Sequence, residues 1–410
     1  MAILVAFLLC LEAALAYWLL YRGGLLSSGR LIYVSALLLA AAFGLRALCL
    51  NYVTLDYQDF LSRWVDFFRQ NGGFAALRYP VGNYNIPYLY FLALFSYFPV
   101  NDLYLIKLLS IFFDVLLAWA GMGIAGKLGC GPRARLVCFF GLLFMPTVVL
   151  NGSLWGQCDS IYVALALMSI YWAMDERPVL SILAMSLAFG FKLQAVFIMP
   201  VLALLWMQGR LRFRHVLLFP VFYVLLVMPA VLLGRPFLET LTLYFSQTGS
   251  IGSGLNYNSP SIFGIFWNVE NEALAAKLAI AAAFAFMLLI LAVCYVNRRR
   301  LNDRALMAAA LLLALGIPFL LPHMHDRYFF AADVISFLAA FAVWYMSPAP
   351  LLVQFASLLG YHAYLKMRYF LPMKYGSWSL ILVLILAGFM LYREFSGRAK
   401  INFDFRLDKS

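Results

Sequence analysis

Carboxylate side chains stand in several connections between the apolar runs of this chain, and Asp56 is the first with a clear chemical use. A carboxylate can take the proton from an attacking hydroxyl group, which makes Asp56 a candidate general base. It stands where an apolar run ends and an amphipathic segment begins, so it is expected to face both lipid and water. The alternative is a carboxylate that only complements the dipole of the following helix. For Asp59, four residues before Arg63, we favour this structural role.

A second polar motif, Trp155-Gly156-Gln157-Cys158-Asp159, opens a later apolar run. It brings an indole, an amide and a carboxylate together, and Gly156 permits a tight turn with close approach of a ligand. The alternative is purely structural: Asp159 as the N-cap of a helix, with Trp155 as a residue of the membrane interface.

The densest group of ionisable side chains is His323, His325, Asp326 and Arg327. Two histidines suggest a metal, but their i, i+2 spacing suits a strand rather than a helix face, and no third histidine is near. We therefore predict no metal site here. The guanidinium of Arg327 matches the geometry of phosphate oxygens and is a candidate phosphate ligand.

Cations also stand at unusual places. Lys192 lies at the junction of two apolar runs, where the alternative to a functional role is a lysine that extends its ammonium group to the membrane surface. Lys366, Arg368 and Lys374 form a basic patch that interrupts the charge pattern of the chain. Such a patch usually has an anionic partner, for example a lipid phosphate. Asp114 lies deep in an apolar run, and we predict a structural ion pair for it.

The elements that must position these groups follow from the composition. The chain has 410 residues, of which 65% are hydrophobic and 12% charged. A soluble domain carries about a quarter charged residues, so a soluble enzyme is excluded. Apolar runs of roughly 17–23 residues recur, which is the length that spans a bilayer as a helix. The net charge of +12 is assigned to the positive-inside rule and to anionic membrane lipids, not to nucleic acid.

We predict an all-α polytopic membrane protein of about thirteen transmembrane helices, folded as a single integral membrane domain. The expected spans are 2–21, 31–52, 103–126, 136–151, 160–174, 178–191, 194–208, 216–234, 274–296, 305–321, 328–346, 350–365 and 377–392. The domain divides into two spans within 1–52, a large outer loop at 54–102, the remaining bundle at 103–396 and a tail at 397–410.

Alternate connections are rich in arginine and lysine, which predicts that they face the cytoplasm. The N-terminus then lies outside, the C-terminus lies in the cytoplasm, and the chain is a multi-pass protein of the plasma (inner) membrane. In the outer loop, Phe60, Trp64, Phe67 and Phe68 form an apolar stripe over 56–69, ended by Asn71-Gly72-Gly73. A second aromatic helix is expected at 87–98. Both helices are predicted to lie parallel to the membrane.

The order and content of these motifs resemble the GT-C glycosyltransferases, in particular bacterial relatives of the glycosylphosphatidylinositol mannosyltransferase II family. The resemblance runs from about residue 50 to residue 345. It rests on Asp56 with Phe60 and Trp64; Asn71-Gly72-Gly73-Phe74; Tyr84-Asn85-Ile86-Pro87-Tyr88-Leu89-Tyr90; Ile106-Lys107 with Asp114; Trp155-Gly156-Gln157-Cys158-Asp159-Ser160-Ile161-Tyr162; Phe191-Lys192-Leu193-Gln194; Asn258-Ser259-Pro260; and His323-Met324-His325-Asp326-Arg327-Tyr328.

The resemblance implies a GT-C-like bundle with a catalytic Asp56 in the first outer loop and a donor sugar carried by polyprenyl phosphate. It implies an inverting transfer of mannose or another hexose to a glycan or lipid-linked acceptor on the extracytoplasmic side. The donor phosphate is expected to bind Lys192, Arg327, Lys366 and Arg368. Residues expected to line the substrate cleft are Asp59, Tyr84, Trp155, Gln157, Asp159, Gln194, Asn258, His323, His325 and Asp326.

No cofactor is expected to be required, and a divalent cation bound by the acidic side chains is the alternative. Two other classes of protein fit some of the same features. A membrane transporter or lipid-linked glycan flippase would also carry charges within the membrane, but the inverted repeats typical of transporters are not seen in the sequence. An acyl- or phosphotransferase would use a histidine as its base, so the relative importance of Asp56 and His325 separates it from a glycosyltransferase.

Overall fold

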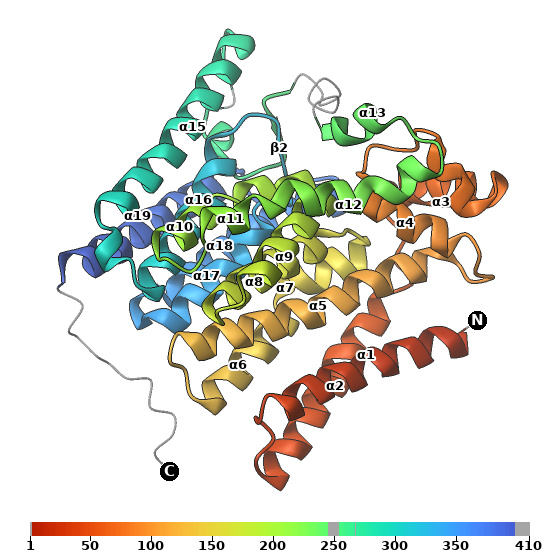
Figure 1. The fold of residues 1–410 in the computed structure, drawn as a ribbon, viewed down its shortest axis with the longest axis horizontal. Helices are drawn as coiled ribbons and strands as arrows, with labels where there is room; N and C mark the ends of the chain where they lie inside the picture. The colour runs from red at the N-terminus through yellow and green to blue at the C-terminus, as the bar shows by residue number, and fades with distance from the viewer. Residues whose placement is uncertain (1, 245–253, 267, 398–410) are drawn as a thin grey trace.

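A computed structural model describes residues 2–244, 254–266 and 268–397, which form a bundle of helices (Figure 1). The predicted tail beyond residue 397 lies outside the described residues. The first half of the chain contains α1 (Ala2–Arg22), α2 (Gly29–Cys49), η1 (Tyr57–Leu61), α3 (Ser62–Gln70), η2 (Gly73–Arg78), α4 (Ile86–Phe95), α5 (Asp102–Lys127), α6 (Pro132–Leu143), α7 (Pro146–Val148), η3 (Val149–Trp155), α8 (Asp159–Met174), α9 (Pro178–Phe191), η4 (Leu193–Phe197) and α10 (Val201–Met207). The second half contains α11 (Phe213–Val216), α12 (Leu218–Leu232), α13 (Phe237–Leu241), β1 (Asn256–Tyr257), η5 (Ile262–Gly264), α15 (Glu272–Val296), η6 (Arg298–Arg300), α16 (Asp303–Leu320), β2 (Met324–His325), α17 (Phe330–Ala342), η7 (Trp344–Met346), α18 (Pro348–Leu365) and α19 (Lys374–Ser396).

The prediction of an all-α polytopic membrane protein is confirmed. Among the described residues, seven helices are long and apolar enough to cross a membrane, and a bent pair, Pro132–Leu143 with Pro146–Trp155, makes an eighth. The other five expected spans coincide with helices that are shorter or less apolar, namely α8, α9, η4 with α10, α17 and α18. Each of the thirteen expected runs therefore has a helical counterpart.

The outer surface of the bundle is apolar. Helix α15 projects along one edge and α1 with α2 along another (Figure 1), and large side chains such as Leu278 and Leu288 of α15 are exposed. In water these apolar faces would promote aggregation, whereas in a membrane they contact the hydrocarbon of the lipids. Helix α5 lies inside, packed against α1, α6 and α8. Helices α5 and α16 are the most deeply buried of the long apolar helices and form the core of the bundle.

The first large loop contains the two expected helices, with different details. The first is a π-helical turn, η1, followed by α3, and the second is α4, capped at its N-terminus by the side chain of Asn85. The buried face of the first helix is Leu61, Val65 and Phe68, whereas Phe60 is exposed. Phe60 lies beside Trp64, the next residue of the predicted stripe, with ring centroids 6.1 Å apart.

The basic connections meet at one end of the bundle. Lys127 at the end of α5 pairs with Asp175 after α8 at 2.6 Å, and Arg210 after α10 pairs with Asp303 at the start of α16 at 2.6 Å. The side chain of Arg300 donates to the carbonyl of Phe395 near the end of α19. The far end of the bundle holds the first loop.

The positive-inside rule predicts the orientation of these two ends. In intact cells, an impermeant thiol reagent should label a Gln70→Cys variant at the end of α3 and should spare a Ser27→Cys variant between α1 and α2, when each is compared with the unmodified chain. Both positions are exposed. The opposite pattern would invert the topology and place the first loop in the cytoplasm.

Candidate active site

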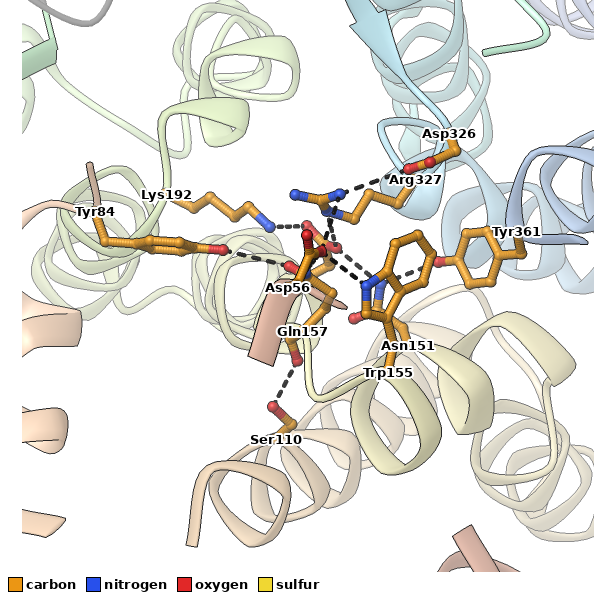
Figure 2. Close-up of polar contacts among 11 residues, drawn as sticks. Asp56, Tyr84, Ser110, Asn151, Trp155, Gln157, Lys192, Asp326, Arg327 and Tyr361 are labelled. Carbon is orange, nitrogen blue, oxygen red and sulfur yellow. Dashed lines mark hydrogen bonds and ion pairs between the residues drawn. The ribbon is translucent and has the colours of Figure 1, made fainter. Parts of the chain in front are cut away.

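Asp56 receives two side-chain hydrogen bonds (Figure 2). Its Oδ2 accepts from Nε1 of Trp155 at 2.8 Å and from Nε2 of Gln157 at 2.6 Å. The carboxylate does not cap the helix that follows it. The structural alternative considered from the sequence, a carboxylate that only serves its own helix, therefore does not describe Asp56.

The segment that carries Asp56 is held at its main chain by a lysine. Nζ of the fully buried Lys107, on α5, donates to the carbonyls of Cys49, Leu50 and Tyr52 at 3.0, 3.0 and 2.6 Å. These carbonyls follow the end of α2, where a helix leaves main-chain oxygens without partners. A buried ammonium group with three acceptors has its donors satisfied. Lys107 thus fixes the chain just before Asp56.

The loop that carries Trp155 and Gln157 begins where an apolar span is broken into two helical segments. Pro146 starts a new helical segment, bent 41° from the preceding one, and the chain then forms the π-helix η3. Gly156 ends it with a φ of +79°, a conformation that favours glycine. The amide of Gln157 then donates to the carbonyl of Asn151 at 2.9 Å, while Ser110 donates to the carbonyl of Gln157 at 2.6 Å. These two main-chain hydrogen bonds orient the Gln157 side chain toward Asp56.

Asp159 forms a buried ion pair with Lys192. Oδ1 of Asp159 lies 2.5 Å from Nζ of Lys192, and Oδ2 accepts from Nδ2 of Asn151 at 2.8 Å. The Asp159 side chain is 1% exposed. A buried charge is tolerated only with such partners, and removal of one member of a buried pair costs about 3–5 kcal/mol. Lys192 is therefore not a lysine that reaches for the membrane surface.

Arg327 lies between three carboxylates. Its guanidinium is 4.0 Å from Asp56, 3.7 Å from Asp159 and 3.5 Å from Asp326, and it stands 5.4 Å from the ring centroid of Trp155. These distances are longer than hydrogen bonds, and Nε of Arg327 has no hydrogen-bond partner among the described residues. The guanidinium is held in place but retains donor capacity for an anion.

Aromatic rings form one wall of the cluster. Trp155 stacks on Tyr364 with centroids 4.3 Å apart and meets Tyr361 edge-on at 5.3 Å. On the other side, the Tyr84 hydroxyl donates to Oε1 of Gln157 at 3.3 Å, and Nζ of Lys192 lies 5.9 Å from the Tyr84 ring centroid. The Tyr84 ring faces a cation, whereas Trp155 and Tyr361 are buried among their neighbours.

Burial shifts the pKa values of the two ionisable side chains that precede Arg327. Burial raises the pKa of Asp326 to about 7, although the neighbouring Arg327 opposes the shift. Burial and the charge of Arg327 lower the pKa of His325 to about 4. His325 is therefore neutral near pH 7 and is a weak base, which argues against the histidine-dependent transferase considered from the sequence.

The structure brings eight of the predicted site residues into one cluster. They are Asp56, Tyr84, Trp155, Gln157, Asp159, Lys192, Asp326 and Arg327.

Other predicted residues lie around this cluster. Asp59 is 52% exposed and pairs with Arg63, so its prediction as a cleft residue is not supported by its position. The ring of His325 stacks on Tyr257 at 4.8 Å, within the parallel pairing of β1 and β2, as its strand-like spacing indicated. Nδ1 of His323 lies 2.7 Å from the carbonyl of Gly254.

Four further predicted residues lie at the edge of the site. Asn258 forms a bridge with His325 and accepts from the Tyr369 hydroxyl at 2.5 Å, and Gln194 hydrogen-bonds Tyr328. Lys366 and Arg368 are exposed in the connection after α18. Their assignment to the donor phosphate stays a prediction.

Sequence reasoning missed the residues that support the cluster. Nδ2 of Asn151 donates to both Asp159 and the Tyr361 hydroxyl, and both residues are buried. An asparagine inside an apolar run was the available signal, since a buried amide needs partners.

The expected structural role of Asp114 is confirmed: it pairs with Arg46 at 2.9 Å, and both side chains are fully buried. Among the described residues, no group of three or more His, Cys, Asp or Glu side chains is arranged to hold a metal ion.

The cluster of charged and aromatic side chains thus lies in a bundle that contains several helices able to span a membrane. The chain belongs to glycosyltransferase family 87, whose family model matches residues 83–322, and the predicted GT-C membership is thereby confirmed. No curated protein matches the chain significantly. The matched range contains Trp155, Lys192 and the residues around them, and Asp56 precedes it. The family supports a transferase over the transporter or flippase alternative.

The raised pKa of Asp326 predicts a pH effect on substrate binding. Above about pH 7 the carboxylate ionises and places a negative charge 3.5 Å from Arg327, which then attracts an anionic substrate less strongly. KM for a phosphate-bearing glycosyl donor should rise between about pH 6 and about pH 8, and Asp326→Asn should flatten this rise. An equal rise in the variant would assign the effect to another group.

Proposed function

We propose that this protein is an inverting glycosyltransferase that moves mannose or another hexose from a polyprenyl-phosphate donor to a glycan or lipid-linked acceptor. One observation carries this proposal: a partly exposed carboxylate, Asp56, lies in the same small cluster as two cations, Arg327 and Lys192. A base and a phosphate site side by side are what such a transfer requires.

Asp56 is the carboxylate best placed to act as the base. Its side chain is 22% exposed, whereas those of Asp159 and Asp326 are 1% and 3% exposed. Trp155 and Gln157 both donate to Oδ2, and Oδ1 is the oxygen to which we assign the proton of an acceptor hydroxyl. Exposure and orientation both favour Asp56.

The reaction is a single displacement. The acceptor oxygen loses its proton to Asp56 and forms a bond to the anomeric carbon, while the bond between that carbon and the phosphate oxygen breaks. Polyprenyl phosphate leaves with the bonding electrons, and the cations of Lys192 and Arg327 stabilise the developing negative charge. Attack opposite the leaving group inverts the anomeric centre.

The donor class follows from the location of the site. Nucleotide sugars do not cross membranes, so an enzyme with an extracytoplasmic cleft needs a sugar that is activated and tethered to the membrane. Polyprenyl phosphate provides both tether and leaving group. We place the protein in the plasma (inner) membrane with the N-terminus outside and the C-terminus in the cytoplasm, as the basic connections predict.

We further propose that transfer needs no cofactor. The role that a divalent cation has in many glycosyl and phosphoryl transfers is to neutralise the leaving phosphate. Lys192 and Arg327 supply that charge here, and Asp159 already accepts from Lys192 and Asn151.

Substitution of Asp56 tests the base. Asp56→Asn keeps the shape but removes the proton acceptor, so kcat should fall by roughly 10²–10⁴ while the protein still inserts and folds. Asp59→Asn is the matched control, since Asp59 pairs with Arg63 in solvent, and its kcat should stay close to that of the native enzyme. Greater loss in Asp59→Asn would move the base to Asp59, and full activity of both variants would remove the base from this loop.

Substitution of Arg327 tests phosphate binding against metal binding. Arg327→Lys keeps the charge but loses the planar fork, so KM for the donor should rise by about tenfold or more. Chelation with EDTA should leave the native rate unchanged. Loss of activity with EDTA that Mg²⁺ or Mn²⁺ restores would instead establish a metal that holds the donor phosphate.

A further inference from the structure

Thr54 lies two residues before Asp56, in the short segment between α2 and the first helix of the outer loop. It is buried, with 5% of its surface exposed. A threonine just before a helix usually caps it, because its hydroxyl accepts from a main-chain amide of the first turn. Here Oγ1 instead donates to the main-chain carbonyl of Trp155 at 3.0 Å, a residue 101 positions later in the chain. The hydroxyl therefore contributes to the contact between two loops of the site.

Trp155 is hydrogen-bonded to the segment 54–56 through both its main chain and its side chain. Its carbonyl accepts from Thr54, and its indole Nε1 donates to Oδ2 of Asp56 at 2.8 Å (Figure 2). Because hydrogen bonds are directional, two of them between the same short segments restrict both distance and orientation. The carboxylate of Asp56 is therefore held in one place relative to Trp155 while both hydrogen bonds are intact.

Trp155 itself has little freedom to move. It is fully buried, its ring stacks on Tyr364 with centroids 4.3 Å apart, and it meets Tyr361 edge-on at 5.3 Å. Directly after it the chain turns at Gly156, where φ is +79°. Packing of the side chain and the turn of the main chain both fix Trp155, so a group hydrogen-bonded to it is fixed as well.

Thr54 also begins the helix that carries Asp56. Its carbonyl accepts from the amide of Gln58 at 3.1 Å, in the first turn of that helix. On the other side of Thr54, the ammonium group of Lys107 binds the main-chain carbonyls that follow α2. The chain is therefore held by α5 before Thr54 and by Trp155 at Thr54 itself.

The place of Asp56 matters because Arg327 lies next to the same two residues. Its guanidinium is 4.0 Å from Asp56 and 5.4 Å from the ring centroid of Trp155. In the proposed transfer, the base acts on the attacking oxygen and the cation on the leaving phosphate, on opposite sides of one anomeric carbon. The distance between base and cation must then match the substrates, and a misplacement of about 1 Å costs about 10²-fold in rate.

We propose that Thr54 is the positioning residue of the base. Its hydrogen bond to the carbonyl of Trp155 holds the carboxylate of Asp56 at the indole and thereby sets the distance from that carboxylate to Arg327. This inference rests on the proposed function, in which Asp56 takes the proton of the acceptor. Thr54 acts through Trp155 and not on the substrates.

Two substitutions of Thr54 separate its hydroxyl from its shape. Thr54→Val keeps the shape but removes the donor, so kcat should fall about tenfold or more. KM for the donor should stay within about twofold, because Lys192, to which the donor phosphate is assigned, is held by Asp159 and not by this segment. Thr54→Ser keeps the hydroxyl, and its kcat should stay within about twofold of the native value. Equal losses in Thr54→Ser and Thr54→Val would overturn the proposal, since the methyl group would then account for both.

Thr240→Val is the matched control. Thr240 is also buried, and its Oγ1 donates to the main-chain carbonyl of Pro236 at 2.7 Å, at the start of α13. The variant loses the same kind of hydrogen bond outside the Asp56 cluster, so its kcat and KM should stay close to the native values. A fall in kcat as large as that of Thr54→Val would assign the effect to a general loss of stability and contradict the positioning role.

A double-mutant cycle with Trp155 tests the route of the effect. Trp155→Phe removes the indole donor to Asp56 but leaves the main-chain carbonyl. Because Thr54 holds Asp56 at that indole, Thr54→Val should lower kcat by less than about threefold in the Trp155→Phe background. Equal falls in the native and Trp155→Phe backgrounds would show that Thr54 acts independently of Trp155, and the proposal would be wrong.

Hydrogen exchange tests the contact without an activity assay. In the full-length protein in nanodiscs, Thr54→Val should speed the exchange of main-chain amides in both 54–61 and 151–159, whereas Thr240→Val should not. Unchanged exchange in these two segments would overturn the proposal. A native protein that never consumes a sugar on polyprenyl phosphate would refute the proposed function, while hydrogen exchange would still decide whether Thr54 holds the two loops together.

Discussion

The cost of a charge in an apolar bundle determines the arrangement of this protein. Inside the membrane an ionised group needs a partner, and the buried charges described above have them: Arg46 pairs with Asp114, Lys107 binds main-chain carbonyls, and Lys192 pairs with Asp159. These contacts tie α2 to α5 and α8 to the segment after α9. Arg327 differs because its distances to three carboxylates exceed hydrogen-bond length. Among these buried charged groups, incomplete pairing is what distinguishes Arg327.

The sequence predicts most of the architecture because a helix that crosses hydrocarbon must have a minimum length and few polar residues. The thirteen runs have helical counterparts, and Asp56, Asp159 and Arg327 were identified because charged groups beside apolar runs are expensive. The π-turn at η1 was not predicted, because no residue type in that stretch signals one.

Contacts between residues far apart in the sequence also could not be predicted. Asn151 and Tyr361 are 210 positions apart, and their hydrogen bond beside Asp159 forms because α18 packs against α7, just before Asn151. His323 and Asn258 look functional in the sequence, yet in the structure they build the short β1 and β2 pairing next to Arg327. Polar residues in a membrane protein serve packing as well as chemistry, and spacing alone does not separate these two uses.

The contact of Lys107 with main-chain oxygens has an evolutionary consequence. Carbonyls are present whatever side chain occupies a position, so this contact makes no demand on the side chains of Cys49, Leu50 and Tyr52 while it holds the chain before Asp56 in place. Lys107 has no such freedom, because no other residue presents a compact ammonium with three donors at that depth. We therefore expect this contact to tolerate many substitutions on the α2 side and few at Lys107 on α5.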